Sequence, residues 1–130
     1  MRGILIDPFN RTIEEIETTG KLPEIYSMLG VELITIVHIG ETDVLFLDDE
    51  GLFVDRHEQE YFQWAGASQP FAGKGLIVGT DEDGDSTDAE ISLEEVNGKV
   101  SWIDKETTDI DPQEFMKVYI MGEDGKWQRL

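Results

Sequence analysis

The run from Glu32 to Ile39 constrains the fold more than any other part of the sequence. It reads Glu-Leu-Ile-Thr-Ile-Val-His-Ile, with apolar and β-branched residues in almost unbroken succession. Such residues favour the pleated surface of a strand, and a run without alternation leaves little room for solvent on either face. The run therefore predicts a central strand. Gly40 to Thr42 predicts a compact turn, and Val44 to Leu47 predicts the antiparallel partner.

The segment before this run predicts a hairpin and a helix. Gly3 to Asp7 is apolar and ends at Asp7-Pro8, where proline removes a backbone donor and favours a turn. Thr12 to Thr18 predicts the second strand of the hairpin. Pro23 is a favourable first helical residue, so the sequence predicts a two-turn helix from Pro23 to Leu29 that ends at Gly30.

The middle of the chain predicts the rest of a meander. Asp48 to Gly51 predicts a turn in which Gly51 supplies a positive φ, and Leu52 to Val54 predicts a third strand. We expect a short helix packed over the sheet at Glu58 to Trp64. Pro70 to Ala72 predicts a loop, and Gly75 to Val78 predicts a strand that closes at Gly79.

The last third of the chain predicts further hairpins. Asn97-Gly98 tolerates positive φ at both central turn positions, which predicts a hairpin in which Leu93 faces Trp102. The remaining predicted elements are a turn at Asp109 to Pro112, a strand at Phe115 to Met121, and a turn at Glu123 to Gly125 that leads into Lys126 to Leu130. The whole predicts an α+β fold, mainly antiparallel β-sheet with one or two short helices.

The length of 130 residues is that of a single domain. We expect residues 1–80 to form the β-rich core and residues 81–130 to supply an acidic loop and C-terminal hairpins. The apolar residues, 39% of the chain, are patterned well enough to argue for a folded domain. The chain has no cysteine, which excludes a disulfide scaffold, a zinc ribbon and a cysteine nucleophile.

Targeting signals are equally sparse in the sequence. No uncharged apolar run approaches the roughly 20 residues that a membrane span requires. The start of the chain reaches a charge and a proline after Ile4-Leu5-Ile6, which is unlike a signal peptide. We therefore expect a cytoplasmic protein.

Sites for catalysis or for a cofactor are not indicated by the motifs. His38 and His57 have no recognisable metal-ligand spacing. No nucleophile elbow occurs, and Gly73-Lys74-Gly75 lacks the Ser or Thr that completes a phosphate loop. We expect a protein that is not an enzyme and that needs no cofactor.

The acidic stretch after Gly79 invites comparison with a calcium loop. With Gly84 at the sixth position, Asp81, Asp83 and Glu90 fall on ligand positions, but Gly79 at the first position offers no side-chain oxygen. Paired helices that would flank such a loop are also missing. We therefore expect a solvated acidic loop between two strands and no metal.

Two other features could recognise a partner. Four aromatic residues lie close together in the sequence and could line a small-ligand pocket, although such residues more often belong to a core: Tyr61, Phe62, Trp64 and Phe71. The second feature is the charge, since 29 Asp and Glu against 10 Lys and Arg give −19. That excess argues against direct contact with nucleic acid, which needs basic residues to displace counterions.

Averaged over the surface, the charge of this chain is roughly threefold more dilute than that of duplex DNA. The chain could imitate a phosphate track only if its acids gather on one face. The candidate partner-binding acids lie in two clusters: Asp48, Asp49 and Glu50, and then Asp81, Glu82, Asp83, Asp85, Asp88 and Glu90. A third acidic cluster runs from Asp104 to Glu114. The alternative is that the acidity serves solubility or adaptation to high salt.

The order of apolar, proline and glycine positions resembles small domains of unknown function carried by phages and plasmids. The segments that carry the resemblance are Ile4 to Pro8, Ile13 to Ile16, Leu22 to Leu29, Val44 to Leu52 and Pro70 to Gly79. The resemblance covers residues 3–80 and brings no catalytic motif. It implies that this acidic chain comes from a mobile element. If a phage encodes it, the resemblance implies a compact acidic protein that acts against host defence in the cytoplasm of the host cell.

We therefore expect a non-enzymatic acidic binding protein that mimics nucleic acid. Its partner would be the basic surface of a nucleic-acid-binding host protein, such as a restriction or CRISPR-type defence protein. The alternatives are a protein that binds or sequesters a small, nucleotide-like molecule, and an acidic, salt-adapted domain without such a partner.

Overall fold

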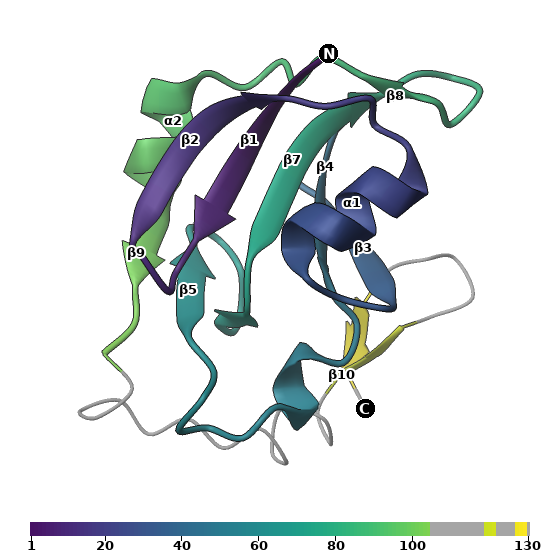
Figure 1. Ribbon diagram of the computed structural model, residues 1–130. Coiled ribbons are helices and arrows are strands. Elements are labelled where there is room, and N and C mark those ends of the chain that lie inside the picture. The colour runs from purple at the N-terminus through teal and green to yellow at the C-terminus, as the bar shows by residue number, and fades with distance from the viewer. Residues whose placement is uncertain (105–118, 122–126, 130) are drawn as a thin grey trace.

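Figure 1 shows the computed structural model, which describes residues 1–104 and the strands at 119–121 and 127–129. The largest element is an antiparallel sheet of six strands in the order β2-β1-β7-β4-β3, with β8 paired to the end of β7. Its strands are β1 (Arg2–Asp7), β2 (Thr12–Glu17), β3 (Ile34–His38), β4 (Asp43–Asp48), β7 (Gly75–Thr80) and β8 (Ser86–Thr87).

A smaller antiparallel sheet packs against one face of the first and has the order β6-β5-β9. The remaining strands are β5 (Tyr61–Trp64), β6 (Phe71–Ala72), β9 (Val100–Trp102), β10 (Tyr119–Met121) and β11 (Trp127–Arg129). The helices are α1 (Leu22–Leu29), α2 (Leu93–Lys99) and the short 3₁₀ helix η1 (Gly51–Phe53). The predicted α+β class, mainly antiparallel sheet, is confirmed.

The core has two layers, one on each face of the large sheet. On one face, Ile25 and Leu29 of α1 pack against alternate residues of β4 and β7. On the other face, the intervening residues Leu45, Leu47 and Ile77 pack against the small sheet and α2. Figure 1 shows α1 across one side of the sheet and α2 with β9 on the other. Because both of their faces are covered, β4 and β7 are the central strands.

The N-terminal predictions are confirmed with shifts of one residue. The strands β1 and β2 form the expected hairpin, with Asp7 paired to Thr12 at its closed end. The helix α1 has proline in its first turn, and Gly30 ends it in the left-handed conformation with φ of 68°. The strand β7 also forms as expected, although it extends to Thr80.

The prediction that Glu32 to Ile39 forms a central strand is wrong. The strand β3 pairs with β4 alone within the described residues and forms one edge of the sheet, so Ile36 remains 39% exposed. The continuous apolar run that is buried on both faces is β4. A run of β-branched residues thus identifies a strand but does not identify its neighbours.

Three local predictions in the middle of the chain are wrong. Leu52 to Val54 is not a third meander strand, because residues 51–53 form η1 and the place beside β4 is taken by β7. The expected helix at Glu58 to Trp64 is instead strand β5, and the expected loop at Pro70 to Ala72 includes its partner β6. Aromatic residues favour strands, and the aromatic strand β5 lies between β6 and β9 in the small sheet.

The expected hairpin at Asn97-Gly98 is also wrong, because this segment lies inside α2. Ser92 caps the helix by accepting a hydrogen bond from the Glu95 N–H at 3.1 Å, and its hydroxyl donates to the Glu95 carboxylate at 3.2 Å. This is the Ser-x-x-Glu capping pattern, and it outweighs the turn preference of Asn-Gly. Trp102 therefore pairs with Phe62 across β5 and β9 rather than with Leu93.

The predicted C-terminal hairpin is confirmed where the structure describes it, since β10 and β11 pair in antiparallel fashion. The predicted turns at 109–112 and 123–125 and the start of the predicted strand, residues 115–118, lie outside the described residues. None of the helices in the described part of the chain has the length and apolar character that crossing a membrane requires.

Candidate functional site

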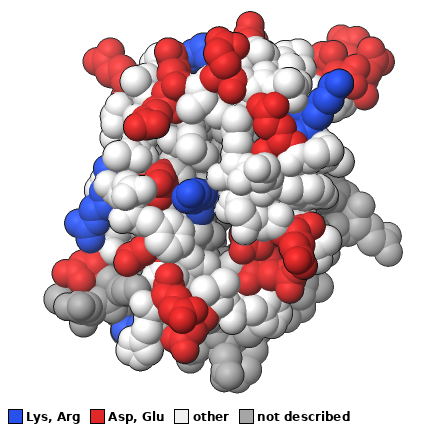
Figure 2. All heavy atoms as spheres, in the orientation of Figure 1, with Lys and Arg blue, Asp and Glu red and all other residues white. Residues whose placement is uncertain are grey.

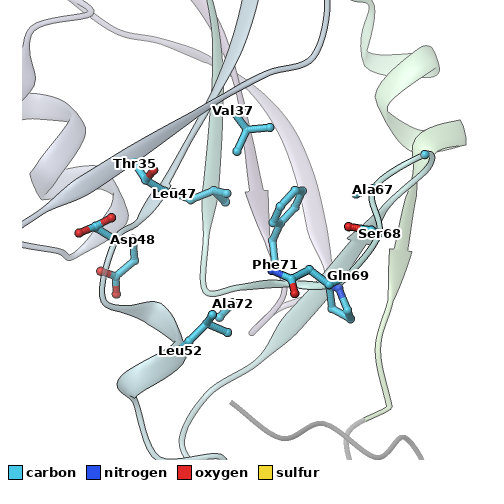
Figure 3. Close-up of a pocket in the computed structure, with 13 residues that line it drawn as sticks. Thr35, Val37, Leu47, Asp48, Leu52, Ala67, Ser68, Gln69, Phe71 and Ala72 are labelled. Carbon is cyan, nitrogen blue, oxygen red and sulfur yellow. The ribbon is translucent and has the colours of Figure 1, made fainter. Parts of the chain in front are cut away.

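The candidate site is a cavity of about 290 Å³ between the edge of the large sheet and the segment that leads into β6. Figure 3 shows Thr35 and Asp48 on one side of it, Ala67, Ser68 and Gln69 on the other, and the Phe71 ring between them. The lining comes from β3, β4, η1, the 66–70 loop and β6: Thr35, Val37, Leu47, Asp48, Asp49, Leu52, Gly66, Ala67, Ser68, Gln69, Pro70, Phe71 and Ala72.

The floor of the cavity follows from strand alternation. Thr35 and Val37 are two residues apart on β3 and so share one face. Thr35 is paired with Leu47 of β4, which also lines the cavity. At this point the edge strand β3 continues the face on which the small sheet packs, and the cavity lies beside the packed core.

The opposite wall is held by hydrogen bonds from a side chain of β5. The side-chain amide of Gln63 donates to the carbonyl of Ala67 at 2.9 Å and to the carbonyl of Trp64 at 3.1 Å. Gly66 allows the tight turn with φ of 90°. Phe71 packs edge-on against Phe62, with ring centroids 5.7 Å apart. The wall is therefore built on contacts that exist without any ligand.

The end of the cavity near η1 is fixed by close backbone packing. A Cβ on Gly51 would lie 2.9 Å from the carbonyl oxygen of Ala72, so only glycine fits there. The buried Gln59 amide donates to the Gly51 carbonyl at 2.8 Å. Gly51 has no positive φ, contrary to the prediction. The residue is required by the approach of two backbones rather than by a turn conformation.

Two side-chain oxygens of lining residues are buried without a partner. Thr35 Oγ1 and Gln69 Oε1 are both inaccessible to solvent and have no hydrogen-bond partner in the described part of the chain. Thr35 as a whole is only 4% exposed. A buried polar atom that lacks a partner costs about 1–3 kcal/mol. If these side chains turned toward the cavity, a ligand with hydrogen-bond donors would recover that free energy.

Asp48 lies on the same side of the cavity as Thr35 (Figure 3). Burial raises the pKa of Asp48 above its ordinary value, and the neighbouring Asp49 acts in the same direction. The hydrogen bond from the Glu50 N–H to Asp48 Oδ1, 2.9 Å long, opposes both effects. Asp48 therefore differs from a fully hydrated acid in an exposed turn.

The four aromatic residues predicted as a pocket are divided by the fold. Phe71 lines the cavity, whereas Tyr61, Phe62 and Trp64 are buried in the core at 1%, 0% and 7% exposure. Sequence reasoning missed Thr35, Gln63 and Gln69. The only signal was the presence of a polar residue within otherwise apolar segments, at Thr35 in β3 and at Gln63 in β5.

The predicted partner-binding acids occupy two separate places. Asp48 ends β4 and is followed by Asp49 and Glu50, whereas the others lie between β7 and α2. Several of these acids bind the chain's own backbone. Asp81 Oδ1 accepts the N–H groups of Asp83 and Asp85, and Asp88 Oδ1 accepts that of Arg2. Of the third acidic cluster, Asp104 to Glu114, only Asp104 is described.

The acids of the predicted calcium comparison come together only in part. Asp81 and Asp83 lie with Asp85, and one carboxylate oxygen of each falls within 4.8 Å of the others. All three side chains are exposed. Glu90, the predicted twelfth position, is not part of this group, and its backbone N–H donates to buried Asp43. His38 is exposed on the edge strand β3, and the His57 N–H donates to Asp55.

Figure 2 shows one face of the molecule coloured by charge. The acidic side chains form separate groups around this face, with uncharged surface and Lys or Arg side chains between them. A phosphate-like track needs a continuous row of negative charge. The face in Figure 2 does not offer one, and the mimicry hypothesis stays a prediction.

Comparison with known proteins gives a family and one curated relative. Over 78 residues the chain is 37% identical to the uncharacterized protein y4iR of Sinorhizobium fredii; the match covers 57% of this chain and 46% of that protein. The chain thus spans about half the length of this curated relative. No solved structure matches the chain. Residues 1–100 match a family model described as a domain of unknown function, DUF3846, and the chain therefore belongs to this family.

Proposed function

We propose that this domain is a non-enzymatic binding protein that holds a small organic molecule in the cavity between β3, β4 and residues 66–72. The observation that carries the proposal is one largely apolar cavity with two lining residues, Thr35 and Gln69, that each have a buried side-chain oxygen without a partner among the described residues. Leaving both unpaired destabilises the free protein. Retaining them is expected where a ligand supplies the missing donors.

The size and lining of the cavity agree with this function. Ligand pockets are mostly apolar concavities of about 300–1,000 Å³ with a few polar groups that fix orientation. At about 290 Å³ this cavity lies at the lower limit of that range. Val37, Leu47 and Phe71 supply apolar walls. A compact ligand, of the size of a nucleobase or an amino acid, fits this space better than a dinucleotide.

The hypothesis of nucleic-acid mimicry against a host defence protein rests on net charge and on the implied origin in a phage or plasmid. It needs acids aligned on one surface, and several of the acids it invokes are engaged with the backbone. The small-molecule alternative is supported by a defined cavity and its lining residues, and it is therefore the function that we put first.

A ligand screen against matched variants tests the proposal. Val37→Phe would place a ring in the cavity, whereas Ile36→Phe adds the same ring on the other, exposed face of β3. We expect ligands from a library of small organic compounds to perturb the amide signals of Thr35, Leu47 and Phe71 in nuclear magnetic resonance spectra. They should also raise the melting temperature, because a ligand at about 100 times its Kd stabilises by about 2.7 kcal/mol.

Both effects should persist in Ile36→Phe and disappear in Val37→Phe. Ala67→Leu, which narrows the cavity from the opposite wall, provides a second blocking variant if Val37→Phe does not fold. The proposal fails if no compound perturbs the cavity residues. It also fails if binding survives in both of the blocking variants.

A further inference from the structure

The polar groups around the cavity are biased in their chemistry. Among the described residues, its lining includes two acidic residues, Asp48 and Asp49, and no lysine, arginine or histidine. The two unpartnered atoms, Thr35 Oγ1 and Gln69 Oε1, are oxygens. An amide oxygen can only accept a hydrogen bond, and a hydroxyl oxygen can accept while it also donates. A ligand that pairs with the Gln69 oxygen must therefore bring a hydrogen-bond donor, and a donor also suits the Thr35 oxygen.

The charge at one side of the cavity selects among the donors. Asp48 and Asp49 are adjacent at the end of β4, and the Asp48 side chain is half-buried. Asp48 Oδ1 accepts the Glu50 N–H, whereas Asp48 Oδ2 and both oxygens of Asp49 accept no hydrogen bond from the described residues. Two neighbouring carboxylates repel one another, and a cation beside them relieves that repulsion.

The apolar walls define the rest of the ligand. Figure 3 shows Val37, Leu47 and the Phe71 ring between the Asp48 side of the cavity and the Gln69 side, with Leu52 below. A fully hydrophilic cation would lose hydration along these walls without compensation. A compact apolar or aromatic body would fill them and keep a charged end near the carboxylates.

We infer, on the basis of the proposed function, that the ligand of this cavity is an organic cation: an amine, amidine or guanidinium group on a compact apolar body. The inference rests on the presence of both acidic residues and residues with unpartnered acceptor oxygens around one apolar cavity. The net charge of −19 supports it in a general way, because a negative surface raises the local concentration of cations and repels anions.

Three probes of nearly equal size and shape test the charge preference: benzamidine, benzamide and benzoate, which are cationic, neutral and anionic at neutral pH. Their binding is measured by chemical-shift titration of Thr35, Leu47 and Phe71 in the wild-type chain. We expect benzamidine to bind at least about tenfold more tightly than benzamide, a difference of about 1.4 kcal/mol. Benzoate should bind more weakly than either.

Matched charge variants identify the source of the preference. The double substitution Asp48→Asn with Asp49→Asn should reduce the preference for benzamidine to less than about threefold. Glu14→Gln with Glu82→Gln removes the same net charge from exposed positions on β2 and after β7, and should leave the preference close to that of the wild type.

The outcomes separate this inference from the proposed function. If benzamide or benzoate binds as tightly as benzamidine, and Val37→Phe blocks that binding, the cavity is a ligand site but the cationic ligand is wrong. An equal loss of preference in both charge variants overturns the inference as well, because general surface charge then explains it. If no probe perturbs the cavity residues, both the inference and the proposed function are contradicted.

Discussion

Asp43 illustrates how individual acids of this chain are used. It is 6% exposed, and its two carboxylate oxygens accept the N–H groups of Glu90 and Ile91, each at 2.8 Å. Asp88, two residues before Glu90, accepts the Arg2 N–H, and the Arg2 guanidinium donates to the Ala89 carbonyl. Charged hydrogen bonds of this kind offset the cost of burying a carboxylate. Part of the acidic run therefore fixes residues 88–91 against the large sheet.

Asp48 carries a prediction about pH. Because burial raises its pKa above the ordinary value of 3.8, the folded chain keeps this proton at pH values where the unfolded chain has lost it. The group therefore favours the folded state below that value, and the contribution is lost as pH rises through the raised folded-state pKa. Asp48→Asn, which can still accept from Glu50, should remove this loss.

Urea unfolding at about pH 4 and about pH 6 measures the effect. The free energy of unfolding of Asp48→Asn, relative to the wild type, should be higher at the upper pH than at the lower. Glu14→Gln on the exposed strand β2 serves as the control and should show a smaller change. An equal or opposite pH dependence in Asp48→Asn would mean that its carboxyl is not destabilised by its surroundings.

At the scale of elements, α2 gives the clearest prediction, because a helix and a hairpin make opposite demands on Gly98. In α2 this residue lacks a positive φ, and a Cβ there would meet nothing within 4 Å. Gly98→Ala should therefore stabilise the chain by about 0.5–1 kcal/mol through helix propensity. A hairpin would need positive φ at Gly98, and alanine would then destabilise it.

Chemical denaturation distinguishes the two signs. Gly30→Ala is the matched control, because Gly30 has equal space around it but a φ of 68°, and alanine there should cost about 1 kcal/mol. If Gly98→Ala destabilises the chain as much as Gly30→Ala does, the assignment of α2 is wrong.

The elements also show what a single sequence can reveal. Signals that reside within a few residues were read correctly, such as Asp7-Pro8 at the hairpin and Pro23 with Gly30 around α1. Gly51, β5 and the edge position of β3 depend on segments far away in the chain, such as Ala72 against Gly51. The α2 error is different in kind: the Asn-Gly turn prediction leaves out Ser92-x-x-Glu95, a local capping signal that lies in the same segment.

The candidate site was harder to predict than the fold for the same reason. Phe71 and the acids at 48–50 are candidates from the sequence because aromatic and acidic residues can bind a partner. The cavity itself exists because β3 pairs with β4 in a particular register and because residues 66–72 return beside them. Neither the register nor the return is encoded locally, so Thr35 and Gln69 resembled ordinary strand and loop residues.

For the whole molecule, the charge of −19 has a thermodynamic consequence whatever the ligand is. The N-terminus pairs with Glu17 and Arg2 pairs with Glu15. With 29 Asp and Glu against 10 Lys and Arg, most acids have no basic side chain to pair with and repel one another, more strongly in the compact state than in the unfolded chain. Salt should relieve that repulsion.

Raising NaCl from about 0.01 M to about 0.1 M shortens the screening length from about 30 Å to about 10 Å. We expect the urea midpoint of unfolding to rise over this range and to level off at higher salt. KCl should give the same curve, since screening depends on ionic strength and not on the identity of the cation. CaCl₂ at equal ionic strength distinguishes screening from binding, because Asp81, Asp83 and Asp85 bring three carboxylates together.

A midpoint that does not move between the two NaCl concentrations would contradict the prediction, and it would mean that the acids are too widely spread to strain the folded state.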